Sequence, residues 1–234
     1  MSTIENNVQD RNSRAWQLLC EYIDQVAEEE REVFIPYKAL GADLYKEIYT
    51  LPESIAKLKS VKRVLLYGSQ LKRIPPEIGQ MESMVEFDPY TSYNLHWFPF
   101  EIMDCKRLID SRVSTRAIYG NYKNRMPFPS LVDAPVQYPG GEVRCSICKK
   151  AMSQSETKQL WVTLWVGTDY LPLLANICSQ ECEDRLDEYP KPPEYYWQHP
   201  HQGGNDLPMP EMTQYEWGVA NGKIIKYNPP GSLN

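Results

Sequence analysis

Residues 51–66 read LPESIAKLKSVKRVLL, and the opening of this stretch returns twice along the chain. LPESI at 51–55 is followed by IPPEI at 74–78, 23 residues later, and by FPFEI at 98–102, a further 24 residues on. A nearly constant period of this length is the signature of a repeat architecture. A single unit cannot bury its apolar side alone, so we expect the units to stack on one another.

The apolar positions inside each unit also stay in register. The aligned sets are Leu58, Met81 and Cys105; Val61, Met84 and Leu108; Val64, Phe87 and Ser111; and Leu66, Pro89 and Val113. The resulting spacing, L-x-x-L-x-x-L-x-L, resembles the leucine-rich repeat family, and LPESIAKLKSV looks like the common bacterial form of that repeat. The resemblance implies one short strand per unit, followed by an arc that turns the chain back. Stacked strands of this kind form a parallel sheet that lines a curved surface.

The units depart from the family pattern in two respects. The Asn that the family places at the turn after each strand is replaced by Ser69, Ser92 and Arg116, and Ser111 occupies a position that is apolar in the other units. We therefore predict three degenerate repeats, with a partial fourth unit before them over residues 33–50. So short an array needs a cap at each end.

The first cap is predicted to be an N-terminal helix. Ser13 is placed to cap its start. Over residues 12–29 the apolar side chains follow the spacing of one helix face, namely Trp16, Leu19, Cys20, Ile23, Val26 and Ala27. Because a helix of this length is only marginally stable alone, this face must pack on another element.

Four cysteines form two close pairs in the second half of the chain. Cys145 and Cys148 are separated by two residues, Cys178 and Cys182 by three, and 29 residues lie between the pairs. This is the spacing of zinc ligands. The intervening chain is predicted to be a hairpin, with strands over 160–166 and 170–177 and a helix that begins at Ser179. The order of knuckle, hairpin and helix resembles a treble-clef zinc finger.

Four thiolates fill a tetrahedral coordination shell, whereas a catalytic zinc keeps one position open for water. We therefore predict one structural Zn²⁺ per chain; two disulfides or four unrelated core thiols are the alternatives. Cys20 and Cys105 are expected to be core residues. A finger that binds DNA is disfavoured, because residues 145–190 carry 7 acidic and 4 basic side chains.

The composition is that of a folded chain without a membrane segment. It has 234 residues, of which 42% are hydrophobic, and its 25 basic and 31 acidic residues give a net charge of −6. Binding of nucleic acid through phosphates normally needs a basic surface and is not expected. No apolar run is long enough to cross a membrane, and no signal peptide is recognised, so a cytoplasmic location is expected. No catalytic motif is present, and we predict that the chain is not an enzyme.

The residues beside the core positions of each strand are expected to point outwards from the sheet. They form the predicted partner-binding face: Arg63, Leu65 and Tyr67; Glu86, Asp88 and Tyr90; and Asp110, Arg112 and Ser114. Parallel stacking places Tyr67 beside Tyr90 and Arg112 beside Asp88. Paired aromatic residues amid mixed charge are typical of a protein-binding hot spot. An ordinary solvated face, or a face covered by the chain's own tail, is the alternative.

The predicted fold is α/β, a short leucine-rich-repeat solenoid with an N-terminal helical cap and a small treble-clef-like zinc module. The expected divisions are 1–32 for the cap, 33–132 for the repeats, 133–190 for the zinc module and 191–234 for a Pro- and Tyr-rich extension. Six prolines in residues 189–210 favour an extended segment lying in a groove of the chain or of a partner. Asn221-Gly222 predicts a terminal hairpin.

Three functions follow from these features. The first is protein–protein recognition through the repeat face, as in an adaptor, inhibitor or immunity factor, with a protein partner of unknown identity. The second is an accessory or regulatory subunit that docks on an enzyme complex through the zinc module and tail. The third is an RNA or single-strand binder that stacks bases on Tyr and Trp, which the acidic balance opposes.

Overall fold

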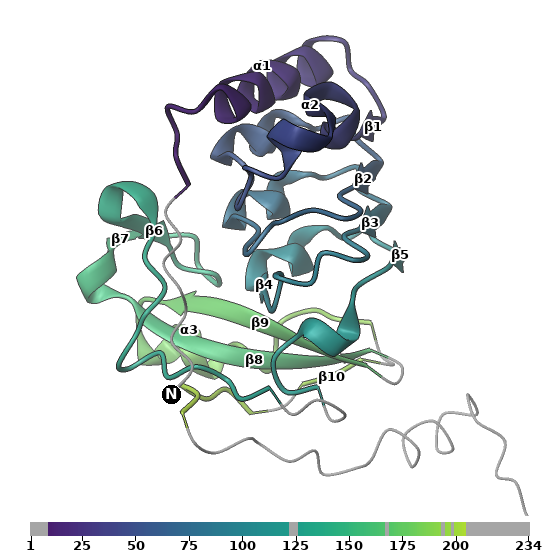
Figure 1. Cartoon of the computed structure of the whole chain (residues 1–234). Coiled ribbons are helices and arrows are strands. Elements are labelled where there is room, and N and C mark those ends of the chain that lie inside the picture. The colour runs from purple at the N-terminus through teal and green to yellow at the C-terminus, as the bar shows by residue number, and fades with distance from the viewer. Residues whose placement is uncertain (1–8, 122–125, 167–168, 193–194, 198, 205–234) are drawn as a thin grey trace, which may run out of the picture.

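The chain combines helices and strands in an α/β arrangement with small, open sheets (Figure 1). The computed structural model describes residues 9–121, 126–166, 169–192, 195–197 and 199–204. Its α-helices are α1 (Arg14–Glu28), α2 (Pro36–Tyr45) and α3 (Gln180–Asp184). Its strands are β1 (Val33–Phe34), β2 (Arg63–Leu65), β3 (Glu86–Asp88), β4 (Phe98–Pro99), β5 (Asp110–Ser111), β6 (Glu142–Arg144), β7 (Ala151–Ser153), β8 (Lys158–Val166), β9 (Asp169–Ile177) and β10 (Tyr196–Trp197).

The strands of the predicted repeats form one parallel sheet in the order β1-β2-β3-β5. Arg63 pairs with Glu86, and Glu86 pairs with Asp110, so the register follows the sequence period of 23 to 24 residues. The stretch before the first full unit contributes β1 to the same sheet, as the partial fourth unit predicted. The alignment of the units is therefore confirmed at the level of the strands.

Short 3₁₀ helices return the chain between these strands. They are η1 (Glu53–Lys57), η2 (Pro76–Gln80), η3 (Phe100–Asp104), η4 (Thr115–Ala117), η5 (Pro139–Gly141) and η6 (Gln154–Glu156). The first three follow Pro52, Pro75 and Pro99, each of which is extended at the position before the helix. The fixed φ of proline suits this position, and the LPxxI motif thus specifies the turn into each helix. The isoleucine or leucine positions of η1 and η2 are buried between these helices and the sheet.

The N-terminal helix covers the first end of the parallel sheet, as predicted (Figure 1). Ser13 caps α1 by accepting a hydrogen bond from the amide of Trp16. Leu19, Ile23 and Val26 of the apolar face are fully buried in the core shared with the repeats. Helix α2 packs beside α1 and is interrupted at Gly41, whose φ of +75° is not helical.

A second sheet joins the two halves of the chain in the order β10-β8-β9-β4. Strands β8 and β9 form the predicted hairpin, and β4, from the third repeat, pairs in parallel with Leu173 and Leu174 of β9. One continuous buried cluster extends from Ala15 in α1 to Trp197 in β10. The boundary expected near residue 132 is therefore crossed by both a sheet and a core.

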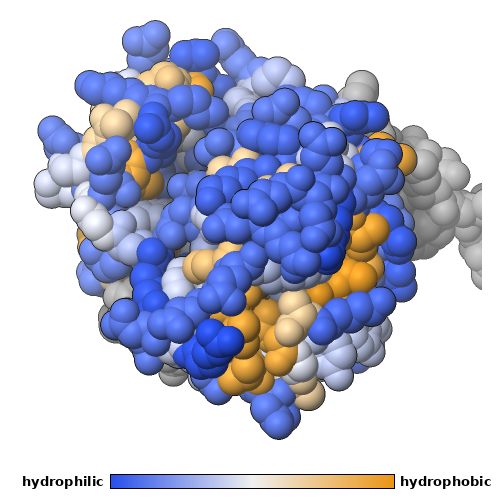
Figure 2. Space-filling model, turned by 90° about the horizontal axis from the view of Figure 1, so that it is seen from above, coloured by the Kyte–Doolittle hydropathy of each residue, from blue (hydrophilic) through white to orange (hydrophobic). Residues whose placement is uncertain are grey.

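The outer surface is mainly hydrophilic where it is seen from the end of the molecule at which α1 lies (Figure 2). Hydrophobic side chains gather in a few places on this side. Among the described residues, no helix has the length and hydropathy needed to cross a membrane.

Candidate functional site

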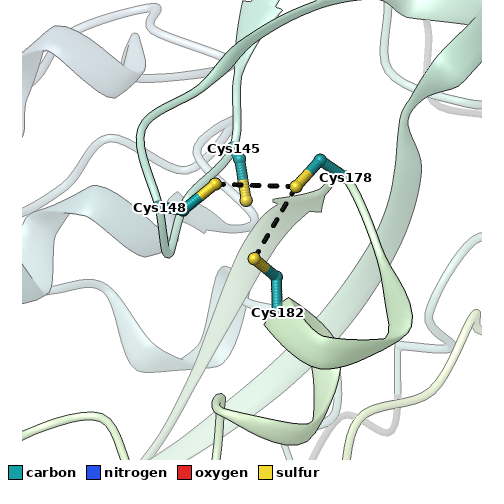
Figure 3. Close-up of side chains that lie close together, drawn as sticks. All are labelled: Cys145, Cys148, Cys178 and Cys182. Atoms are coloured by element: carbon teal, nitrogen blue, oxygen red, sulfur yellow. Dashed lines mark hydrogen bonds between the residues drawn. The ribbon is translucent and has the colours of Figure 1, made fainter.

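The four predicted metal-ligating cysteines lie together (Figure 3). The sulfur atoms of Cys145, Cys148, Cys178 and Cys182 are all within 4.8 Å of one another. The Sγ of Cys178 is 3.5 Å from that of Cys148 and 3.6 Å from that of Cys182. All four thiols are free, which argues against the alternative of two disulfides.

The first cysteine pair is held in a tight turn between β6 and β7. The amide of Cys145 donates to the carbonyl of Lys150 at 2.9 Å, and the amide of Lys149 donates to the carbonyl of Cys145 at 2.9 Å. Lys149 has a φ of +63°, a left-handed conformation that closes the turn. Cys145 is fully buried and Cys148 is exposed, so the cluster lies at the surface.

The second pair spans the end of β9 and the start of α3. Cys178 follows the last residue of β9, and Cys182 lies in the first turn of the helix. Ser179 caps α3, and its hydroxyl accepts the amide hydrogen of Cys182 at 3.3 Å. The cap predicted at Ser179 is therefore confirmed, and it fixes the direction in which the Cys182 sulfur points.

The donor set fits a tetrahedral metal ion. Four sulfurs at about 2.3 Å from one zinc ion would lie roughly 3.8 Å apart, close to the separations seen here. A hydrogen bond from the backbone of Lys150 lowers the pKa of the Cys148 thiol to about 7, which favours the thiolate that a metal needs. Four thiolates would leave no open coordination position, so the cluster can hold a metal but has no room for water on it.

A buried polar network fastens the cysteine knuckle to the third repeat, and sequence reasoning missed it. The hydroxyl of Ser146, between the two cysteines, donates to Glu101 of η3 at 2.6 Å and accepts from the amide of Asn176 at 2.9 Å. Glu101 is 7% exposed, and burial raises its pKa to about 7. The side chain of Asn176 also binds Gln159 and Tyr138 at 2.9 Å each. The only sequence signal was a glutamate before the isoleucine of FPFEI, which gives no partner.

Most of the predicted partner-binding face is present on the parallel sheet. Tyr67 is 62% exposed and Tyr90 is 46% exposed, and their ring centroids are 6.1 Å apart. Arg63 is paired with Glu86, and Arg112 lies 3.5 Å from Asp88. Leu65 is partly exposed and Asp110 is exposed. The juxtapositions of the tyrosines and of Arg112 with Asp88 are therefore as the register predicted.

Two members of the predicted face are buried, which corrects the prediction for them. Asp88 is 7% exposed, because its carboxylate accepts the amide of Tyr90 at 3.1 Å and faces Arg112. Ser114 is 8% exposed and accepts the amide of Thr91 at 2.7 Å. Strand β5 ends at Ser111, so the alternation that would expose Ser114 does not extend to it.

Serines also link the turns after the strands. The hydroxyls of Ser69 and Ser92 are 2.7 Å apart, and Ser92 donates to the carbonyl of Leu66. In the third unit the contact to the preceding turn is made by Ser114, whereas the sequence alignment predicted Arg116 at the turn position. The alignment slips here because the third unit leaves the repeat path after β5.

The tail lies against the chain itself as far as it is described. β10 pairs with β8 through Trp165 and Leu164, and the ring of Trp197 stacks on Phe100 at 5.7 Å. Further along, the amide of Leu131 donates to the carbonyl of Gln202 at 2.8 Å. Of the two predicted locations, the groove of the chain is therefore the observed one for this part. The hairpin predicted around residues 221–222 lies outside the described residues.

The remaining candidate ligands do not assemble into a second centre. Within the described parts of the chain, the four cysteines are the one group of His, Cys, Asp and Glu side chains close enough to share an ion. Cys105 is buried and its thiol donates to the carbonyl of Ile78, as expected of a core residue. Burial lowers the pKa of His201 to about 4, and its ring packs on Phe128. A scan against models of known protein families gives no match for this chain, and a search among curated proteins gives none either.

Proposed function

We propose that this chain is a non-catalytic protein-recognition module that binds a protein partner through the exposed face of the β1-β2-β3-β5 sheet. The observation that carries the proposal is the adjacent pair of exposed tyrosines, Tyr67 and Tyr90, on an otherwise ordered surface. Tyrosine presents a large apolar ring together with a polar hydroxyl group, and it is enriched among the residues that dominate binding energy at interfaces. Tyr93, which is 64% exposed, extends the same aromatic area.

The charges on the face support a protein partner over a nucleic acid. Both arginines of the face are engaged with carboxylates of the neighbouring strand, Arg63 with Glu86 and Arg112 with Asp88. Paired in this way they are poorly placed to neutralise phosphates, which is the main source of affinity for nucleic acid. An aromatic centre surrounded by polar, mutually compensated groups matches the anatomy of a protein–protein interface.

Under this proposal the parallel strands are successive turns of a short leucine-rich-repeat solenoid, capped by α1. The 23-residue register between β2 and β3, and the 3₁₀ helix after each LPxxI-like motif, support this assignment. The knuckle, the β8–β9 hairpin and α3 correspond in order to a treble-clef-like finger. The cysteines bind one Zn²⁺ per chain, because an all-thiolate tetrahedral set favours zinc among common divalent ions. The zinc stabilises the fold and takes no part in chemistry.

The alternative of docking through the tail is less well supported. Residues 195–204 that the structure describes are already occupied by contacts within the chain, through β10 and through the bridge between Trp161 and His201. A partner would have to displace these contacts before it could use this segment.

The test is the double variant Tyr67→Ala/Tyr90→Ala, compared with Tyr37→Ala as a control. Tyr37 is 51% exposed but lies on α2, away from the face. A tagged wild-type chain is used to isolate its partner from an extract of the source cells, and the affinity of each variant for the purified partner is then measured by calorimetry. We expect the double variant to bind at least about 30-fold more weakly, which corresponds to roughly 2 kcal/mol, with little change in Tm.

Unchanged affinity in the double variant would contradict the proposal, since the tyrosines would then lie outside the interface. Equal weakening by Tyr37→Ala would contradict it too, because the effect would not be specific to the sheet face. Unfolding of the double variant would show that the two rings are structural.

A further inference from the structure

The parallel sheet is open at its third repeat. Val64 of β2 and Phe87 of β3 occupy equivalent positions in the register, and each is only 1% exposed. Ser111 of β5 pairs with Phe87 at the same level but is exposed. A serine side chain is too small to fill the space that valine or phenylalanine fills in the other units. The core therefore has an entrance beside β5.

An apolar cleft of about 270 Å³ lies at this entrance. Its walls are formed by core side chains of both sheets, including Phe87, Phe98, Leu164 and Leu173, and Ser111 lies on its edge. Small-molecule sites usually measure about 300–1,000 Å³, so the cleft suits one or two apolar side chains better than a whole ligand of that size.

The edge of β5 beside the cleft has backbone groups that no strand covers. The amides of Asp110 and Arg112 donate to the carbonyls of Val85 and Phe87, at 3.1 and 3.2 Å. In a parallel ladder the amide between them, that of Ser111, points away from β3. In the part of the chain that the structure describes, β5 is the last strand of its sheet. An uncovered edge of this kind is a template for another strand.

We propose that an extended segment of a protein partner adds to the edge of β5 as a further strand and places a large apolar side chain in the cleft. Strand addition obtains affinity from main-chain hydrogen bonds and specificity from pockets for alternate side chains, and both elements are present here. The inference rests on the proposed function in that the partner is a protein, and it names a second contact next to the tyrosine face.

The charges at the cleft define the partner segment further. Lys106 and Lys191 line it, and Asp110 is the one acidic residue among its lining side chains. The ammonium group of Lys106 lies over Tyr189 and that of Lys191 over Trp197, so both stay near the opening. Charge complementarity favours a segment in which the apolar residue is flanked by Asp or Glu.

The probe is a yeast-displayed library of random peptides, selected on the full wild-type chain and counter-selected on Ser111→Phe. Phenylalanine at this position fills the cleft as Phe87 fills the preceding unit. We expect enriched peptides to alternate apolar and polar residues, with acidic residues beside the apolar one. Binding of a synthetic enriched peptide, followed by fluorescence polarisation, should weaken at least about tenfold in Ser111→Phe and stay unchanged in Ser111→Ala, which keeps both the cleft and the amide.

Strand addition is tested separately from apolar contact by Ser111→Pro. Proline removes the outward amide but leaves the two bonds to β3, and proline is tolerated on edge strands. We expect at least about a tenfold loss of peptide affinity with Tm unchanged. Since this variant could fail to fold, exchange of the Ser111 amide is also followed by NMR in the wild-type chain, where bound peptide should slow it at least about tenfold.

The inference is overturned if no peptide is enriched over Ser111→Phe, or if bound peptide leaves the exchange of the Ser111 amide unchanged. Binding to Tyr67→Ala/Tyr90→Ala separates the two proposals, because the peptide should bind that variant as it binds the wild type. Failure of the peptide test with a positive result for the tyrosine test would therefore reject the strand-addition site alone.

Discussion

The two sheets of this protein are held together in different ways. The β1-β2-β3-β5 sheet consists of strands of two or three residues, and each strand pairs with one that lies one repeat away in the sequence. The β10-β8-β9-β4 sheet is centred on two nine-residue strands and recruits its outer strands from distant parts of the chain. The first is stabilised by many similar contacts between neighbouring units, whereas the second depends on a few long-range contacts and on the cysteine cluster.

The difference teaches where the molecule is sensitive to change. In a stacked array, stability is approximately a sum over units and their nearest neighbours, so damage to one unit is spread over its neighbours. In the hairpin region, one bound metal ion would tie the knuckle, the end of β9 and α3 together at a single point. The regions meet where β4 pairs with β9 and where Glu101 accepts the hydroxyl of Ser146.

The largest effect is expected from removal of the metal ligands. We predict that Cys145→Ser/Cys148→Ser binds no zinc and loses several kcal/mol of stability, because binding of structural zinc contributes directly to the free energy of folding. Metal analysis and near-UV circular dichroism are the measurements, since Trp161 and Trp165 of β8 are buried and report on the hairpin. Cys20→Ser, a half-buried thiol outside the cluster, should retain both zinc and the tryptophan signal.

An unaltered thermal transition in the double cysteine variant would break the comparison. The hairpin region would then be held by its apolar contacts alone, and the cluster would have no structural role. Loss of zinc in Cys20→Ser would place the site elsewhere or indicate an indirect effect of folding.

A smaller effect is expected at the junction of the two regions. Burial raises the pKa of Glu101 to about 7, above the value of about 4.5 that it has when unfolded. The folded chain therefore binds this proton more tightly, so the contribution to stability is present below about pH 4.5 and is lost as the pH rises through about 7. We predict that Glu101→Gln removes this loss and is more stable than the wild type at pH 8, by at most about 3 kcal/mol.

Urea unfolding at several pH values is the measurement, with Glu47→Gln as the control because Glu47 is exposed. The control should follow the pH profile of the wild type. If Glu101→Gln also followed it, the glutamate would be ionised in the folded chain across this range, and the connection between the regions would be stronger than burial indicates.

The sequence predicts the first region better than the second. The 23-residue period aligned Val64 with Phe87 and Tyr67 with Tyr90, because a repeated pattern records which residues are neighbours in the stack. The same pattern placed Ser111 at a core position, and the opening of the core beside β5 is the physical consequence. Asp88 was assigned to the surface because alternation alone does not show that its carboxylate closes the turn at Tyr90.

In the second region only local signals could be read. The spacing of the cysteines predicted their cluster, and Ser179 predicted the start of α3. The pairing of β4 with β9 could not be predicted, because Phe98-Pro99 is part of a turn motif and a two-residue strand has no periodicity. The bond between Ser146 and Glu101 was also hidden, since it joins residues 45 positions apart whose types are ordinary at a surface.

The central claim is that zinc holds the hairpin region and not the repeat sheet. Hydrogen–deuterium exchange of the wild-type chain, with and without a zinc chelator, tests it most directly. We predict that chelation accelerates exchange in the knuckle, β8, β9 and α3, while β2 and β3 retain their protection. No change on removal of a bound zinc ion, or an equal loss of protection in both sheets, would contradict the claim.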